Sequence, residues 1–290
     1  MASIDAGVRI AVIPLHLQKR ISKPNHMARP QIGLALGGGF ARGIAHAGVL
    51  RVFERSGISL HCITGVSAGS IVAAAYASGV SPDEIGRAGS AVRFRDVARW
   101  SLCRTGFMAT ERMARFLRHL LKTHRFEEMR IPLGVVATDL CTGEAVSFRD
   151  VGDVFVPIRG SCAYPGLFQP VRSGDRLLVD GAMSMEIPAM QARELGATHV
   201  ISVALPAPKI RRPPSDVFQV IRRCFQIMQG RSERGWREVS DLVIAPDLGT
   251  IEWDSFESGP DMVKAGEAAA LAALPVIESW FLEDSSELTA

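Results

Sequence analysis

Short apolar runs alternate along the chain with longer segments whose apolar residues recur at helical spacing. Segment 41–57 places its apolar residues three and four positions apart and ends at Gly57, which predicts a helix. The alanine-rich segment 68–79 predicts a second helix. The apolar runs of strand length are 32–36, 61–66, 131–140, 144–150, 176–181, 198–205 and 241–246. Strands that alternate with helices predict an α/β fold, with a mostly parallel sheet covered on both faces.

Two stretches interrupt this alternation, residues 92–128 and residues 207–239. Both mix basic and bulky apolar residues at helical spacing. Either stretch could cover a site as a lid or touch a membrane surface, or it could pack on the sheet as a peripheral helix. The pattern leaves these interpretations open.

The length of 290 residues fits one large domain, and we expect that domain over residues 30–290, after an extension formed by residues 1–29. No apolar run reaches the roughly 18–20 residues needed to span a bilayer, and we expect neither such a helix nor a secretory signal. The five cysteines contain no CxxC pair, which is typical of reduced thiols. These features predict a cytoplasmic protein.

The net charge of +3 is distributed unevenly. Residues 87–130 carry eleven Lys and Arg against four Asp and Glu, whereas residues 250–290 carry nine acidic residues and one lysine. The basic part could face an anionic surface, such as the inner face of a membrane to which the protein binds peripherally, or it could be a set of solvated helix faces. We expect no nucleic-acid partner, and the oligomeric state is open.

The first candidate site is the glycine-rich segment GGGFARG, residues 37–43, which directly follows a predicted strand. Gly37, Gly38 and Gly39 let the backbone approach a ligand with its N–H groups turned inward. Such a loop before a helix can bind a phosphate or the oxyanion of an acyl-transfer reaction. Arg42 breaks both the P-loop pattern and the spacing of a dinucleotide-binding loop, so nucleotide binding is the weaker interpretation.

The second candidate is the segment GVSAG, residues 65–69, which fits G-x-S-x-G. This pattern marks a serine displayed as a nucleophile on a tight strand-to-helix turn. Ser67 lies between a predicted strand and a predicted helix, and the amide of Ala68 would lie near the helix N-terminus. The alternatives are a chance match and a serine that only caps the helix. The placement favours the nucleophile.

A serine nucleophile needs a base, and Asp180 is the best-placed candidate. It ends a predicted strand, although an Asp-Gly pair is also a common turn. His199 satisfies the chain order of a Ser-Asp-His triad, but it opens its strand at the edge of a parallel sheet opposite to Ser67. His46 and His61 are also poorly placed. Partial burial would raise the pKa of Asp180 and make it a workable base.

Together these segments resemble the patatin-like phospholipase family, of the compact bacterial kind. The resemblance implies a three-layer α/β/α sandwich with a mostly parallel central sheet, and hydrolysis of lipid acyl esters without a metal or an organic cofactor. Phospholipids and lysophospholipids are among the substrates that it implies. The similar segments are 33–50, 65–70, 136–148, 156–171 and 177–182, within residues 31–205, followed by 263–275, which is similar to the usual closing helix of the family.

Carried over residue by residue, the resemblance implies that Ser67 is the nucleophile and Asp180 its base. Arg42 would hold the glycine loop or contribute charge to the site. The oxyanion loop and its surroundings would comprise Gly37, Gly38, Gly39, Arg42 and Ala68.

One departure from the family pattern is Glu186, which stands where the family often has an asparagine. A carboxylate at this position could perturb Asp180 or point away from it. Two alternatives therefore stay open. One is a catalytically weak family member that binds lipid or a protein partner, and the other is a His-dependent esterase or thioesterase.

Overall fold

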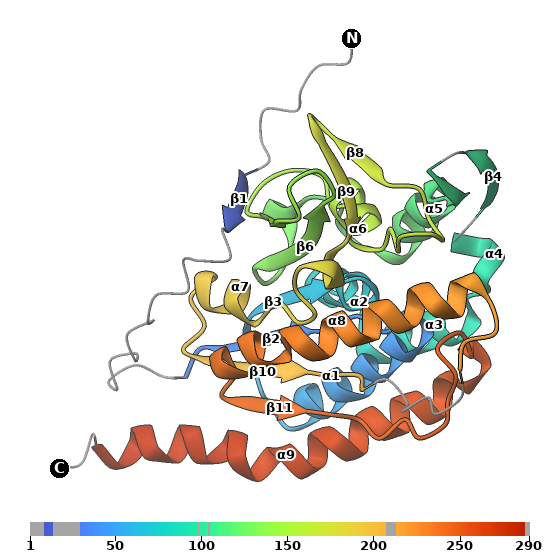
Figure 1. Cartoon of the computed structure of the whole chain (residues 1–290). Helices are drawn as coiled ribbons and strands as arrows, with labels where there is room; N and C mark the ends of the chain where they lie inside the picture. The colour runs from blue at the N-terminus through green and yellow to red at the C-terminus, as the bar shows by residue number, and fades with distance from the viewer. Residues whose placement is uncertain (1–8, 14–29, 98, 104, 207–212, 288–290) are drawn as a thin grey trace.

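A central sheet with helices on both faces forms the body of the molecule (Figure 1). The computed structural model describes the chain except residues 1–8, 14–29, 98, 104, 207–212 and 288–290. Within the described residues the sheet has nine strands. Its main path is β1 (Arg9–Ile13), β7 (Ala145–Arg149), β6 (Leu133–Asp139), β3 (Leu60–Val66), β2 (Ile32–Leu36), β10 (His199–Val203) and β11 (Leu242–Ile244). Two further strands, β8 (Val171–Ser173) and β9 (Arg176–Asp180), join it beside β6.

The sheet is parallel from β6 through β3, β2 and β10 to β11, and antiparallel at its other side. There β1, β7, β8 and β9 each run against their neighbours. Tight turns join β6 to β7 and β8 to β9, and such short connections require antiparallel pairing. The predicted parallel sheet is therefore confirmed for β2 and β3, the strands that precede the glycine loop and Ser67. Residues 176–180, in contrast, form β9, which runs antiparallel to β6.

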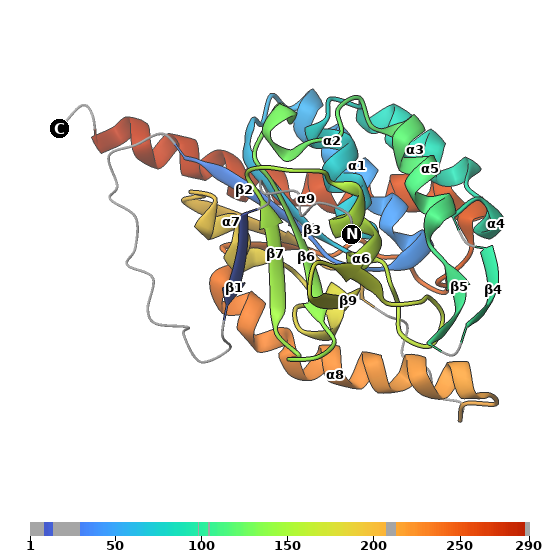
Figure 2. The ribbon, with the colours of Figure 1, turned by 90° about the horizontal axis from the view of Figure 1, so that it is seen from above.

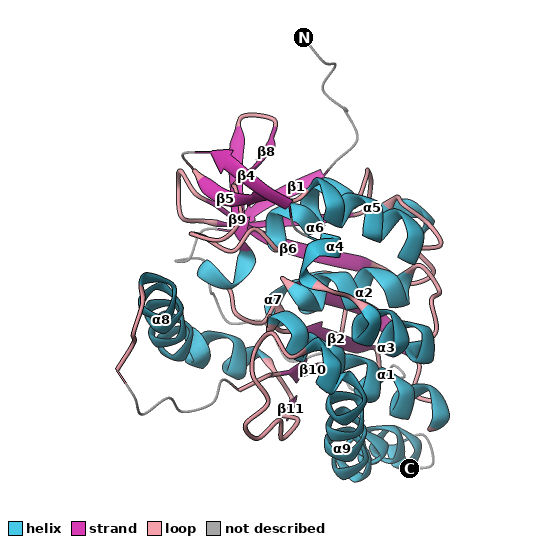
Figure 3. Cartoon of the chain, turned by 90° about the vertical axis from the view of Figure 1, so that its right-hand side faces the viewer, coloured by secondary structure: helices cyan, strands magenta, loops and turns pink. Residues whose placement is uncertain are grey.

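The helices form two layers that enclose the sheet (Figure 2, Figure 3). One face is covered by α1 (Ala45–Arg55), α2 (Ala68–Ala77), α3 (Pro82–Ala91), α6 (Phe155–Ser161) and α9 (Gly259–Glu287). The other face is covered by α7 (Ala189–Glu194) and α8 (Val217–Val239). This arrangement is the three-layer α/β/α sandwich that the resemblance implies.

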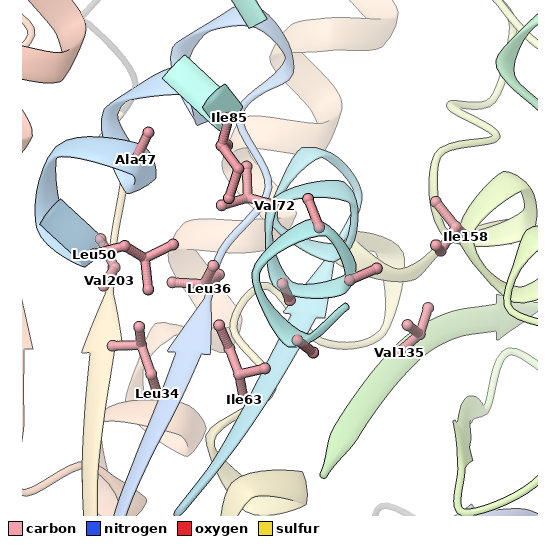
Figure 4. Packing of buried hydrophobic residues seen from close by; sticks show 14 of the residues in the cluster. Leu34, Leu36, Ala47, Leu50, Ile63, Val72, Ile85, Val135, Ile158 and Val203 are labelled. Carbon is pink, nitrogen blue, oxygen red and sulfur yellow. The ribbon is translucent and has the colours of Figure 1, made fainter. Parts of the chain in front are cut away.

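The strands bury both faces, because their alternate residues enter different cores. Leu34 and Leu36 of β2 pack under α1 and α2 together with Ile63 of β3 (Figure 4). Ala35, which lies between the two leucines, belongs to the smaller core under α7 and α8. Full burial on both sides accounts for the continuously apolar strand sequences.

Residues 92–128 contain less helix than their spacing predicts. They begin with α4 (Phe94–Val97) and continue with a hairpin of β4 (Arg99–Cys103) and β5 (Gly106–Ala109). Helix α5 (Glu111–Leu120) and a 3-10 turn, η2 (Phe126–Glu128), follow. Within the described residues this hairpin forms a separate two-stranded sheet, and a bridge between Met108 and Phe168 connects it to the segment before β8.

Helix α9 contains segment 263–275, which resembles the family, and extends beyond it in both directions. Its buried residues, among them Met262, Ala270 and Ile277, pack in the core on the α1 side of the sheet. Among the described residues, one helical segment, Phe256–Leu282, is long and apolar enough to cross a membrane by its length and composition. From the sequence we expect no such helix, because that expectation considers the length of single apolar runs. In α9 charged residues divide the apolar stretches, so no single run is long although the helix as a whole is.

Strand β1 lies in the N-terminal segment, residues 1–29, that the sequence sets apart as an extension. Its residues Arg9–Ile13 pair with β7 from Arg149 back to Ala145. The rest of the segment, residues 1–8 and 14–29, lies outside the described residues. β1 therefore occupies the antiparallel end of the sheet, away from the glycine loop.

Candidate active site

Ser67 occupies a tight turn between β3 and α2, as the G-x-S-x-G pattern predicts. Its backbone φ is 52° and its ψ is −128°, a conformation that a residue with a side chain rarely adopts. A Cβ added to Gly65 would lie 2.4 Å from the carbonyl oxygen of Gly69, and one added to Gly69 would lie 2.4 Å from that of Leu36. Both glycines are therefore required by close backbone contacts, which hold Ser67 at the carboxyl end of β3.

Strands β3 and β9 meet end to end along one side of β6, and this brings Ser67 and Asp180 together. On β6, Val136 pairs with Val66 of β3, and the next residue, Ala137, pairs with Asp180 of β9. The other side of Val136 and Ala137 is occupied by β7. Because β3 and β9 approach from opposite directions, the residue after one strand faces the last residue of the other.

The hydroxyl Oγ of Ser67 donates a hydrogen bond of 2.7 Å to Oδ2 of Asp180. The second carboxylate oxygen, Oδ1, accepts a bond of 2.9 Å from the N–H of Ala182. Asp180 is almost fully buried, at 2% exposure. Burial raises the pKa of Asp180 to about 6, and the hydrogen bonds from Ala182 and Ser67 oppose this shift. The carboxylate is thus oriented on one oxygen and directed at Ser67 with the other.

The backbone N–H of Ser67 is held by a side chain that the sequence did not single out. It donates a bond of 2.8 Å to the hydroxyl of Ser161 in α6, which itself donates to the carbonyl of Val136. Ser161 is fully buried. It lies within residues 156–171, which resemble the family, but the pattern assigned it no role. Ser161 therefore fixes the turn that carries Ser67 to strand β6.

The glycine loop lies beside Ser67, between β2 and the 3-10 helix η1 (Phe40–Ile44). A Cβ added to Gly38 would lie 3.3 Å from the Cβ of Ser67, so the backbone of the loop lies close against Ser67. The N–H of Gly37 donates to the carbonyl of Val203 at 3.1 Å and cannot also serve a ligand in this arrangement. The N–H groups of Gly38 and Gly39 bond to no carbonyl in the part of the chain that the structure describes.

Two buried side chains support the loop from behind. His46 of α1 donates from Nε2 to the carbonyl of Gly37 at 2.9 Å, and burial lowers the pKa of His46 to about 4. Its imidazole is therefore neutral at physiological pH. The guanidinium of Arg42 donates to the carbonyl of Pro206, and burial lowers the pKa of Arg42, against the attraction of Glu252. Arg42 thus ties the loop to the segment after β10.

Ala68, the first residue of α2, follows Ser67 directly. The first N–H groups of a helix have no intrahelical acceptor, so the amide of Ala68 is a candidate donor at the site. The side chain of Ala68 lies against Gly43, where an added Cβ would meet it at 2.7 Å. This contact packs the start of α2 against the helical turn that follows the glycine loop.

A cavity of about 930 Å³ opens over Ser67 and Asp180. Its size falls in the range of ligand-binding pockets. The α2 and α5 walls are apolar, and the α8 wall is mostly polar. Apolar lining residues include Ile71, Val72, Ile85, Met113, Phe116 and Leu120. Polar lining residues on α8 include Gln219, Arg222, Gln226 and Gln229.

Glu186 also lines this cavity, and its carboxylate is bound to α8. Its Oε2 accepts a hydrogen bond of 3.0 Å from the indole Nε1 of Trp236. Burial raises the pKa of Glu186, and the bond from Trp236 opposes the shift. The carboxylate that departs from the family pattern therefore joins the loop after β9 to α8.

The remaining histidines considered in the sequence lie away from Ser67. His199 opens β10 and pairs with Ile32, the first residue of β2, at the edge of the sheet opposite to Ser67. His61 is near the start of β3, and its Nε2 lies 3.0 Å from the carbonyl of Leu195. Among the described residues, no group of three His, Cys, Asp or Glu side chains could hold a metal ion.

Two known proteins are similar to parts of this chain in sequence. An uncharacterized NTE family protein of Mycobacterium tuberculosis is 32% identical over 179 residues, which cover 61% of this chain and 49% of that protein. Lysophospholipase NTE1 of Debaryomyces hansenii is 28% identical over 195 residues, covering 64% of this chain and 12% of that protein. The chain spans about half the length of the first of these relatives.

Among solved structures, VipD from Legionella pneumophila has a similar fold, with a TM-score of 0.51 at 14% identity over 86% of this chain and 67% of that chain. The family model described as patatin-like phospholipase matches residues 34–193, which include the glycine loop, Ser67 and Asp180. This match extends over more than half of the 290 residues. The chain therefore belongs to the patatin-like phospholipase family.

Proposed function

We propose that this chain hydrolyses the carboxylic esters of lipids, with Ser67 as nucleophile and Asp180 as general base. The observation that carries the proposal is the 2.7 Å hydrogen bond between their side chains at a cavity beside the glycine loop. A carboxylate with a pKa near 6 is ionised at neutral pH and still basic enough to take a proton. The family membership supports a lipid acyl ester as the substrate.

In the first half of the proposed reaction, Oγ of Ser67 attacks the ester carbonyl carbon and its proton passes to Asp180. The carbonyl oxygen becomes an oxyanion, which the N–H groups of Gly38 and Gly39, with that of Ala68, are placed to stabilise. The bond to the alcohol oxygen then breaks, and Asp180 returns the proton to the leaving alcohol. The product is an acyl-serine.

In the second half, Asp180 takes a proton from water as the water oxygen attacks the acyl carbonyl. The tetrahedral intermediate collapses, the bond to Oγ breaks, and the proton passes from Asp180 to Ser67. The free fatty acid leaves, and both side chains return to their starting states. The apolar wall of α2 and α5 offers a place for the acyl chain during both halves.

The test is turnover of a short p-nitrophenyl ester by the Ser67→Ala and Asp180→Asn variants. We expect each to lower kcat/KM by about a thousandfold or more, since the groups of such a unit act together. Two exposed residues supply matched controls, Ser56→Ala and Asp175→Asn, the latter in the turn before the same strand β9. Turnover that survives either site substitution would refute the proposed dyad.

A further inference from the structure

Helix α8 has two faces with different partners. Its inner face closes the cavity: Phe225 is buried and stacks on Tyr164 with ring centroids 4.5 Å apart, and Trp236 binds Glu186. Gln226 lines the cavity from the same helix. One face of α8 therefore forms part of the wall of the candidate active site.

The outer face of α8 carries an apolar stripe that nothing in the described residues covers. Val217 is 64% exposed, Val220 is 44% exposed and Ile227 is 53% exposed, and Cys224 between them is exposed as well. Their spacing of three, four and three positions aligns them along one side of the helix. We call these four residues the outer stripe. A row of exposed apolar side chains along one helix face is a candidate interaction surface.

The charge of α8 indicates which surface the outer stripe meets. The helix contains five arginines and two glutamates. The two glutamates, Glu233 and Glu238, pair with Arg237 and Arg234 within the helix. The same line continues past Ile227 to exposed Arg231, so an apolar half is followed by a basic half. An apolar stripe flanked by arginines is typical of helices that lie on anionic membrane surfaces.

Helix α9 provides a contrast within the same chain. It exposes Leu271 and Leu282, at 57% and 70%. Its C-terminal part, however, carries Glu278, Glu283 and Asp284 without a basic residue. An anionic surface would repel this helix end, so exposed leucines alone do not favour membrane docking here.

We infer that the outer stripe of α8 docks on the surface of an anionic phospholipid bilayer. Docking places the helix that forms one wall of the cavity at the lipid surface, so a lipid would reach Ser67 by passing along α8. The choice of a lipid as occupant rests on the proposed function. Burying one exposed aliphatic side chain in the interface strengthens binding by about tenfold, and nearby arginines add to it.

The experiment measures co-sedimentation of the full chain with vesicles, in a Ser67→Ala background so that no lipid is consumed. The vesicles are phosphatidylcholine alone or phosphatidylcholine mixed with phosphatidylglycerol. The stripe variant is Val220→Asp with Ile227→Asp, and the matched control is Leu271→Asp with Leu282→Asp on α9. Thermal unfolding checks that each variant is folded.

We expect the stripe variant to need about a hundredfold more mixed-vesicle lipid for half-maximal binding, and the control to match the parent protein. Phosphatidylcholine vesicles and high salt should both weaken binding of the parent. Equal binding by the stripe variant and the parent overturns the inference. So does a stripe variant that only dissociates a dimer, because the occupant would then be a second copy of the chain.

A second measurement keeps the three aliphatic residues of the outer stripe and uses its fourth residue, Cys224, to carry a probe. Cys224 carries an environment-sensitive fluorophore in a chain with Cys103 and Cys141 replaced by serine, and a parallel sample carries the label on Cys141 with Cys103 and Cys224 replaced. Mixed vesicles should shift the emission of the Cys224 label to the blue and leave the exposed Cys141 label unchanged. Equal responses from the two labels overturn the inference.

Hydrolysis of a soluble p-nitrophenyl ester by the stripe variant with Ser67 intact separates the two proposals. The docking surface does not line the cavity, so this activity should equal that of the parent. Loss of vesicle binding with full soluble activity supports the inference. A parent chain that binds vesicles through the stripe but hydrolyses no ester contradicts the proposed function and leaves the docking surface supported.

Discussion

Ser67 and Asp180 are 113 residues apart in the chain, yet their side chains form a hydrogen bond of 2.7 Å. The contact arises because β3 and β9 run toward each other along the same side of β6 and stop at adjacent residues, Val136 and Ala137. A fully parallel sheet would give no such end-to-end meeting. The antiparallel return of β9 is thus the structural basis of the proposed dyad.

The pH dependence of hydrolysis should report Asp180. Burial raises the pKa of Asp180 to about 6, and the base must be ionised to accept the Ser67 proton. We therefore expect kcat/KM for an uncharged ester to be constant at higher pH and to fall tenfold per pH unit below about pH 6. A rate that stays constant down to pH 4 would contradict the assignment of Asp180 as the base.

Ser161 should act as a positioning residue for Ser67. Its hydroxyl accepts a hydrogen bond from the N–H of Ser67 and donates one to the carbonyl of Val136, so Ser161→Ala leaves that N–H without its acceptor in a partly buried turn. We expect kcat to fall by about ten- to a hundredfold, with KM changed much less. Ser161→Thr keeps the hydroxyl and should restore part of the activity. Equal rates for Ser161→Ala and the parent would rule out this role.

Substitution of His46, which supports the glycine loop, should lower the rate of hydrolysis, whereas substitution of His199 should not. His46→Ala removes the bond to the carbonyl of Gly37, and we expect about a tenfold or larger loss of kcat. His199→Ala acts at the far edge of the sheet and should leave the rate within about twofold of the parent. A large loss in His199→Ala would instead favour a His-dependent esterase.

Much of this site follows from local sequence patterns, and the rest depends on tertiary pairing. Gly65 and Gly69 are required by close backbone contacts, and a Cβ added to Gly39 would lie 2.7 Å from the side chain of Leu205, so these glycine patterns are informative. The place of β9 in the sheet is set by its pairing with β6, which lies far from it in the chain and which no local pattern encodes. The role of Ser161 is likewise visible only once α6 packs beside Ser67.

The glycine loop illustrates the same division. The sequence predicts that its N–H groups face a ligand, but it cannot tell which of them bond elsewhere. In the structure Gly37 donates to Val203 of β10, a strand that follows more than 160 residues later. Gly38 and Gly39 are left as the candidate donors. Likewise, Glu186 could perturb Asp180 or point away in the sequence, and its bond to Trp236 directs it to α8.

The apolar wall of the cavity should set the preferred acyl-chain length. Val72 of α2 lines the cavity and is nearly buried, so Val72→Phe fills part of the space beside Ser67. We expect the ratio of kcat/KM for a long-chain to a short-chain p-nitrophenyl ester to fall by about tenfold or more. Leu271→Phe on the exposed face of α9 serves as the control. An unchanged ratio would place the acyl chain elsewhere.

The central claim is that Ser67 is a nucleophile activated by Asp180, and covalent labelling tests it most directly. The protein is incubated with a fluorophosphonate, and the modified peptide is identified by mass spectrometry. We predict a single adduct on Ser67 that is absent in Ser67→Ala and forms about a hundredfold more slowly in Asp180→Asn. An unmodified Ser67, or equal labelling rates in Asp180→Asn and the parent, would contradict the account.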